Sequence, residues 1–190
     1  IGGEAHKSGR NALGAIGIVG TIRLLNGDEG ANIKGVFRKD KDSAGFLVPV
    51  DSFLPFFGRK SSSGDGLDQD SRRTDLLAIQ LMLTGNEEPH LEIFAKGVES
   101  KYLSSTFSTD SADEALEQAN ASIELFKELI EVSLENGGMP ERLGLLNIIK
   151  FGLRISSPST QEKITEWIMF EKRVYQALLR GRYEYKKSRY

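Results

Sequence analysis

The 190 residues of this chain are enough for one domain with a substantial hydrophobic core. Hydrophobic residues make up 39% and charged residues 27%, as in soluble globular proteins, and no apolar run reaches the roughly 20 residues that span a bilayer, so a membrane protein is not expected. The absence of cysteine excludes disulfides and thiolate metal sites, and the net charge of −2 excludes an overall attraction to nucleic acid.

The first predicted elements are a helix and two short strands. Residues 11–25 form an apolar run spaced by glycines, which favours a helix packed closely on a sheet. After turn residues at 26–30, residues 33–38 and 45–50 are predicted as strands. Residues 61–71, SSSGDGLDQDS, are polar and without periodicity, which predicts a mobile loop.

A β-hairpin is predicted in the middle of the chain. Residues 75–83 and 91–103 are strand candidates, and the connecting TGNEEPH contains the Gly, Asn and Pro typical of a turn. If the hairpin is centred near Glu87, residues that lie opposite each other have numbers that sum to 174. Asp75 is then expected to face Glu99.

Three helices are predicted after the hairpin, over residues 111–136, after Pro140, and from Ser159 to Gly181. Ser111 with Glu114, and Ser159 with Glu162, have capping-box spacing, and Asn136, Gly137 and Gly138 end the first of these helices. The positions predicted to lie on one face of the first helix or to face inward from the second are Ala112, Leu116, Ala119, Ile123, Phe126, Ile130, Leu143, Leu146, Ile149 and Leu153. The last helix is predicted to run through Ile164, Trp167, Ile168 and Leu178, with Trp167 in the core.

This order of elements predicts an α/β (α+β) fold, a mixed sheet flanked by helices. We expect one domain over residues 1–190, with a core at about 11–135 and a helical extension at about 140–190. Because the chain begins with Ile1 rather than methionine, we expect it to come from a longer protein. The last stretch, 180–190, interleaves cations with aromatics, which is typical of a local nucleic-acid-binding cluster, but the favoured interpretation is a solvated helix end or a truncated linker.

The residues with the clearest chemical meaning are Asp75, Glu99 and Lys101. Two directly opposed carboxylates repel each other unless a cation lies between them. Because side chains alternate along a strand, Lys101 shares the face of Glu99. Carboxylates favour Mg²⁺ or Mn²⁺, and with only two histidines, His6 and His90, a histidine-rich zinc site is not expected. Such an ion polarises a phosphate and activates water, and Lys101 could stabilise the developing charge.

An aspartate at the start of a strand, followed at hairpin distance by Glu-x-Lys and then a long helix, resembles the PD-(D/E)XK nuclease superfamily, which includes restriction endonucleases. The resemblance covers about residues 11–135. It implies a restriction-endonuclease-like fold, metal-binding carboxylates at Asp75 and Glu99, and a catalytic lysine at Lys101. The RRTDLL and ESKY segments are similar to nuclease domains of large ATPases in bacterial restriction and phage-defence systems.

Two features depart from that superfamily. Residues 11–25 contain no glutamate, although many members have one on the first helix. The fourth core strand that should follow the helix at 111–136 is not evident, and it is expected beyond Tyr190 or displaced by inserted helices.

The predicted function is therefore a Mg²⁺-dependent DNA endonuclease domain in the cytoplasm. Arg72, Arg73, Arg59 and Lys60 are the predicted phosphate contacts near the site. Two alternatives stay open. One is a non-catalytic nucleic-acid-binding or docking module of a larger helicase or ATPase, and the other is a structural interaction domain.

Overall fold

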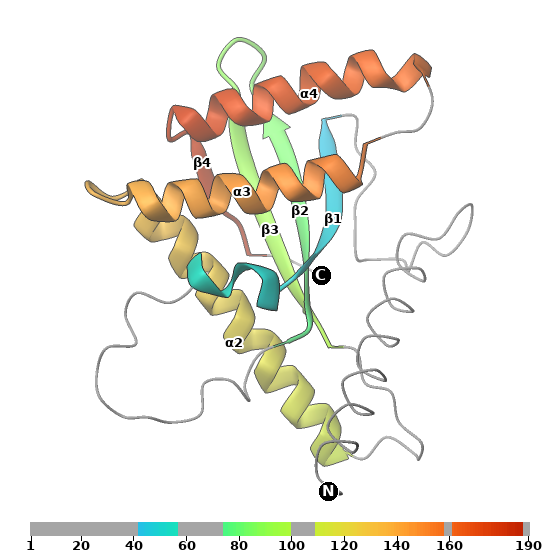
Figure 1. The fold of residues 1–190 in the computed structure, drawn as a ribbon, viewed down its shortest axis with the longest axis vertical. Helices are drawn as coiled ribbons and strands as arrows, with labels where there is room; N and C mark the ends of the chain where they lie inside the picture. The colour runs from blue at the N-terminus through green and yellow to red at the C-terminus, as the bar shows by residue number, and fades with distance from the viewer. Residues whose placement is uncertain (1–41, 57–73, 100–108, 158–160, 188–190) are drawn as a thin grey trace, which may run out of the picture.

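A computed structural model describes residues 42–56, 74–99, 109–157 and 161–187 (Figure 1). These residues form four strands, three α-helices and one short 3-10 helix. In chain order they are β1 (Ser43–Pro49), η1 (Asp51–Phe56), β2 (Leu76–Thr84), β3 (His90–Val98), α2 (Thr109–Leu134), α3 (Met139–Ile155), α4 (Gln161–Leu179) and β4 (Tyr183–Tyr185). The predicted α/β fold is confirmed.

The four strands make one mixed sheet in the order β1-β2-β3-β4. β1 and β3 are both antiparallel to β2, whereas β4 is parallel to β3. Gly85, with a φ of 74°, lies in the turn between β2 and β3 and adopts a left-handed conformation that favours glycine. The predicted hairpin is therefore confirmed, although β3 ends at Val98 and residues 100–103 lie outside the described part of the chain.

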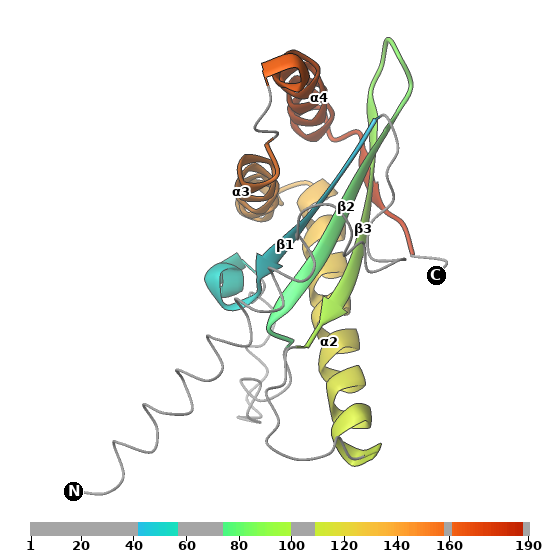
Figure 2. The same cartoon turned by 90° about the vertical axis from the view of Figure 1, so that its right-hand side faces the viewer.

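The main core lies between one face of the sheet and the three helices. Phe46, Ile79 and Ala95 occupy neighbouring positions across β1, β2 and β3, and all three are at least 95% buried. Figure 2 shows α3 and α4 stacked on that face, while α2 runs beside the lower half of the strands. On the opposite face, Leu47 and Ala78 are also buried, so β1 and β2 are covered on both sides.

Two glycines of α3 let this helix approach the sheet closely. A Cβ at Gly152 would lie 2.1 Å from the ring of Phe46, and one at Gly144 would lie 2.7 Å from the ring of Phe56. Since such separations are sterically impossible, the aromatic rings occupy the space that a larger side chain would need. This contact fixes α3 against β1 and η1.

The three helices predicted after the hairpin are confirmed, with some differences at their ends and on their faces. α2 begins at Thr109, so Ser111 lies inside the first turn and not at the N-cap. The predicted inward positions Phe126, Ile130, Ile149 and Leu153 are buried. The positions wrongly predicted to face inward are Ala112, Leu116 and Leu143, all of which are exposed. On α4, Leu178 is buried and Ile168 is exposed.

These errors have a geometric cause. The first turns of α2 extend past the ends of the strands, so they have no sheet to pack against (Figure 1). The exposed positions of α3 and α4 lie on the side away from the sheet. A period of 3.6 residues identifies an apolar stripe but does not identify which part of it is covered.

The interpretation of residues 180–190 as a solvated end or linker is wrong for residues 183–185. They form β4, and Tyr183 is 98% buried. Its hydroxyl lies 2.7 Å from Ser133 Oγ of α2. On the same strand, Glu184 lies 3.1 Å from His90 Nε2 and 3.0 Å from Lys186 Nζ, and Lys186 and His90 together lower the pKa of Glu184.

Several predicted elements lie outside the described residues. These are the helix at 11–25, the strand at 33–38, the loop at 61–71 and the cap residue Ser159. None of the helices in the described ranges has both the length and the apolar composition that a membrane crossing requires.

Candidate functional site

The candidate site lies where β2 begins and β3 ends. Every pair between these strands, from Leu76 with Val98 to Thr84 with His90, sums to 174, so the predicted register is confirmed. Asp75 and Glu99 are the next residues outward from the Leu76–Val98 pair. Continued by one position, the register places them opposite each other, and both are partly buried.

The face shared by these two residues is otherwise apolar. Because side chains alternate along a strand, Asp75 lies on the same face as Leu77, Ile79 and Leu81 of β2. Glu99 lies on the same face as Gly97 and Ala95 of β3. The three β2 residues and Ala95 are at least 97% buried. The two acids therefore lie at the end of a dry face, where charge interactions are stronger than in bulk water.

The backbone around Asp75 is held from two sides. The amide of Val50, after β1, donates a hydrogen bond of 3.1 Å to the carbonyl oxygen of Asp75. The amide of Thr74 donates a hydrogen bond of 2.9 Å to Ser122 Oγ of α2. β1 and α2 thus fix the position at which the Asp75 side chain leaves the sheet.

α2 reaches the end of β3 through a close contact with a glycine. A Cβ at Gly97 would lie 2.5 Å from Ala119 Cβ and 2.6 Å from Ala119 Cα. Glycine is the residue that allows this approach, two positions before Glu99. The contact brings the Ala119 turn of α2 against the end of β3 that leads to Glu99.

Gln118 is a third polar residue at this end of the sheet, and the sequence reasoning missed it. Ala119 meets Gly97, whereas Ser133 meets Tyr183, which pairs with Leu91, so α2 runs antiparallel to β3. Residues before Ala119 therefore lie toward the Glu99 end. Gln118 is one turn before Ser122 and is 91% buried. Gln118 and Ser122 interrupt the apolar stripe of α2 with polar side chains, and this interruption is the signal that could have identified Gln118.

The buried oxygen atoms at this end of the sheet are suited to a hard cation. Glu99 Oε2, Gln118 Oε1 and Thr74 Oγ1 are all shielded from solvent. Carboxylate and amide oxygens are ligands for Mg²⁺, which commonly takes only one or two protein carboxylates and completes its shell with water and phosphate oxygens. Within the described ranges, no cluster of three or more His, Cys, Asp or Glu residues is arranged to hold a metal. Two carboxylates with further oxygen donors fit Mg²⁺, but not zinc.

Five of the predicted site residues lie outside the described part of the chain. They are Lys101, Arg72, Arg73, Arg59 and Lys60. His90 and Trp167 do not belong to the candidate site. His90 instead links β3 to Glu184, and Trp167 packs on the core beside Phe170, with ring centroids 5.7 Å apart.

We compared the chain with protein-family models, with curated protein sequences and with solved structures, and no match was found in any of the three.

Proposed function

We propose that this chain is a Mg²⁺- or Mn²⁺-dependent DNA endonuclease of the PD-(D/E)XK type. The observation that supports the proposal most directly is the β2–β3 register, whose continuation brings Asp75 opposite Glu99 at the end of a buried apolar face. Two carboxylates that close together are suited to a shared cation, since burying charge costs free energy unless a counter-charge offsets it.

The topology agrees with this proposal. The resemblance implied a fourth core strand after a helix, either beyond Tyr190 or displaced by inserted helices. β4 follows α2 with α3 and α4 inserted between them, and it lies beside β3. The order of three antiparallel strands, a helix and a further strand is the one that the resemblance implies.

In this proposal each residue has a separate role. Asp75 and Glu99 would hold the cation, and Gln118 would orient a water or one of the carboxylates at the same end. When bound, Mg²⁺ supplies positive charge that polarises the scissile phosphate and makes a nearby water more acidic. Lys101, two residues after Glu99, would stabilise charge that develops on the phosphate. Arg72, Arg73, Arg59 and Lys60 would bind neighbouring phosphates.

The proposed setting is that of a bacterial restriction or phage-defence system in the cytoplasm, with an ATPase or helicase as partner. The RRTDLL and ESKY segments support this setting by their similarity to such nuclease domains.

The test is a cleavage assay on plasmid and single-stranded DNA with Mg²⁺, Mn²⁺ or EDTA. We expect cleavage only with the metals, and a loss of at least about 10²-fold in rate for Asp75→Asn and for Glu99→Gln, as is typical when one charge-stabilising group is removed. Glu92→Gln is the matched control, because Glu92 lies on β3 but on its opposite face. Equal cleavage by all variants would refute the site. DNA binding without cleavage by the unmodified chain would favour the docking-module alternative.

A further inference from the structure

The outer side of α3 and α4 exposes several large apolar side chains. Leu179 is 67% exposed, Ile168 57% and Ile155 52%. These residues lie on the side of the helices that faces away from the sheet. Large exposed apolar side chains gathered on one surface are characteristic of a binding site for another molecule.

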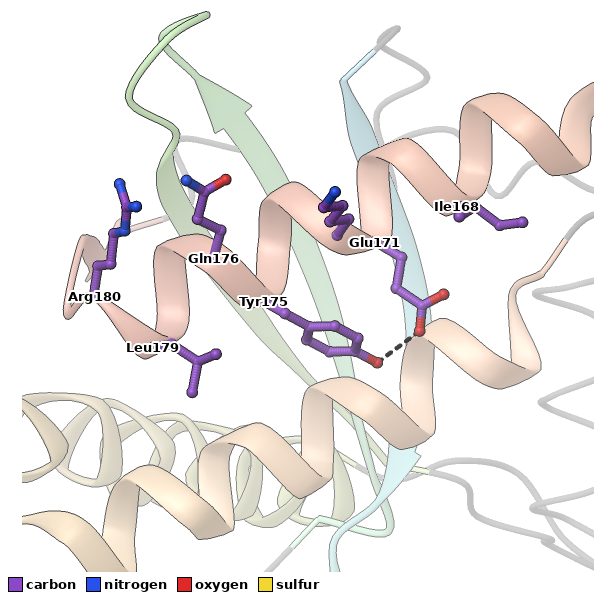
Figure 3. Close-up of a pocket in the computed structure, with 7 residues that line it drawn as sticks. Ile168, Glu171, Tyr175, Gln176, Leu179 and Arg180 are labelled. Carbon is purple, nitrogen blue, oxygen red and sulfur yellow. Dashed lines mark hydrogen bonds between the residues drawn. The ribbon is translucent and has the colours of Figure 1, made fainter.

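A groove of about 820 Å³ runs along this side of α4. Its apolar lining comes from Ile168, Tyr175 and Leu179, which recur at spacings of seven and four residues. Figure 3 shows Tyr175 and Leu179 projecting from α4 toward α3. A second hollow of about 470 Å³ lies on the outer side of α3, beside Phe151 and Ile155.

Four cations surround these two hollows. Lys172 and Arg180 line the groove on α4, and Lys150 and Arg154 line the hollow on α3. All four are exposed. Among the described residues, none of these four takes part in an ion pair.

The groove is also lined by one carboxylate, that of Glu171. Tyr175 donates a hydrogen bond of 2.7 Å to Glu171 Oε1 (Figure 3). Burial and this carboxylate raise the pKa of Tyr175, while Arg154 acts in the opposite direction, which shows that α3 contributes positive potential to the groove.

Several other cations in the described ranges are paired with carboxylates of the fold. Arg173 pairs with Asp42 at 2.9 Å, Arg182 with Glu88 at 3.0 Å, and Lys186 with Glu184 at 3.0 Å. In a chain with a net charge of −2, an apolar groove bordered by more cations than carboxylates is therefore a local exception.

We propose that the α3–α4 outer face binds an acidic amphipathic helix of a partner protein. A helix that places apolar residues every three or four positions matches the groove, and carboxylates on its flanks match Lys150, Arg154, Lys172 and Arg180. Nucleic acid is a poorer fit, because its phosphate backbone offers nothing to cover Ile168 and Leu179.

A second copy of this chain is also a poorer fit. Its acidic helix is α2, which carries seven acidic residues and one lysine. The apolar side of α2, with Phe126 and Ile130, is already buried in its own core. α2 therefore has no apolar stripe to place in the groove of another copy.

The α4 groove of this face is distant from Asp75 and Glu99. Arg173 of α4 donates a hydrogen bond of 2.8 Å to Gly85 O in the hairpin turn, at the opposite end of β2. β2 has nine residues, which corresponds to roughly 30 Å of strand. Partner binding and the proposed nuclease site are thus separable, and either can fail without the other.

The test measures binding of two labelled model helices by fluorescence anisotropy. Both are about 18 residues long with leucine every three or four positions, a length that spans the groove. One carries glutamates on its flanks and the other carries lysines. We expect the acidic helix to bind at least about tenfold more tightly than the basic one, with an affinity that falls as salt is added.

Variants locate the site. Lys172→Glu with Arg180→Glu should weaken binding of the acidic helix at least about tenfold, and so should Leu179→Glu. Lys187→Glu is the matched control, because Lys187 is an exposed lysine after β4, outside the groove. The Lys187→Glu variant should bind the acidic helix with unchanged affinity. DNA cleavage should be the same in the unmodified chain and in all three variants.

Three results would overturn the proposal. The first is equal binding of the two helices, or no binding of either. The second is binding of a DNA duplex that is lost in the Lys172→Glu, Arg180→Glu variant while the acidic helix does not bind, which would reassign the face to nucleic acid. The third is dimerisation that is abolished by Leu179→Glu, which would reassign it to a second copy.

Discussion

Ser122 determines how α2 holds the start of β2. Its hydroxyl accepts the hydrogen bond of the Thr74 amide at 2.9 Å, and both residues are at least 98% buried. Ser122→Ala would leave that amide buried without an acceptor, a loss of about 1–3 kcal/mol in the free energy of unfolding. The measurement is urea denaturation, with Asn120→Ala, an exposed position of the same helix, as the control. Equal stability of the two variants would contradict this role.

Individual residues also show where sequence reasoning succeeded. The β2–β3 register, whose continuation would bring Asp75 opposite Glu99, could be predicted because a short turn and a strict two-residue alternation leave little freedom in the register of a hairpin. Gln118 and Ser122 were missed because the face of α2 was predicted from its apolar residues alone. Their burial depends on Thr74 and Gly97, which are distant in sequence, and no local pattern encodes that contact.

At the scale of elements, β4 is attached to α2 through Tyr183 and Ser133. Ser133 Oγ donates a hydrogen bond of 2.6 Å to Ile130 O, so the Tyr183 hydroxyl must be the donor in the 2.7 Å contact between them. Ser133→Ala would leave that hydroxyl buried without an acceptor, at a loss of about 1–3 kcal/mol, whereas Tyr183→Phe should lose only about 1 kcal/mol.

The double variant separates this hydrogen bond from the packing of the two side chains. Ser133→Ala with Tyr183→Phe removes donor and acceptor together, so it should be more stable than the sum of the single losses implies. Denaturant midpoints of the four proteins give the coupling energy. Strict additivity would show that the hydrogen bond contributes nothing to stability.

The close contact between α2 and β3 gives a second prediction at this scale. Gly97→Ala would place a Cβ 2.5 Å from Ala119 Cβ, so α2 would have to move. An alanine in a strand usually stabilises relative to glycine, but the clash reverses the sign here, and we expect a loss of about 1–3 kcal/mol. Thermal unfolding measures it. A variant as stable as the unmodified chain would show that α2 lies further from the sheet.

Among the elements, the hairpin and the three helices could be predicted, whereas β4 could not. The hairpin strands carry their own alternation and turn, and the helices carry an apolar period. β4 has only three residues and pairs in parallel with a strand about 90 residues earlier, so its sequence contains no local signal. Its basic and aromatic composition instead indicated a solvated tail.

At the scale of the whole molecule, α3 and α4 are inserted between α2 and β4, the last described strand. This insertion leaves the site and the groove at different ends of the sheet. The end of the sheet with Asp75 and Glu99 is formed by β1, β2, β3 and α2, while the other end, at the hairpin turn, is covered by α4. The proposed nuclease site and the proposed partner-binding groove can therefore be tested separately.

Metal binding at Asp75 and Glu99 should stabilise the whole fold, independently of any activity. A ligand present at ten times its Kd adds about 1.4 kcal/mol to the free energy of unfolding. For a domain of this size, that raises Tm by about 3–6 °C. Asp75→Asn should not show this metal-induced rise in Tm. Without metal, the variant should be at least as stable as the unmodified chain, because opposed carboxylates repel. Differential scanning fluorimetry with MgCl₂, against NaCl at equal ionic strength, measures both effects. An equal rise in the Asp75→Asn variant would show that Mg²⁺ binds elsewhere.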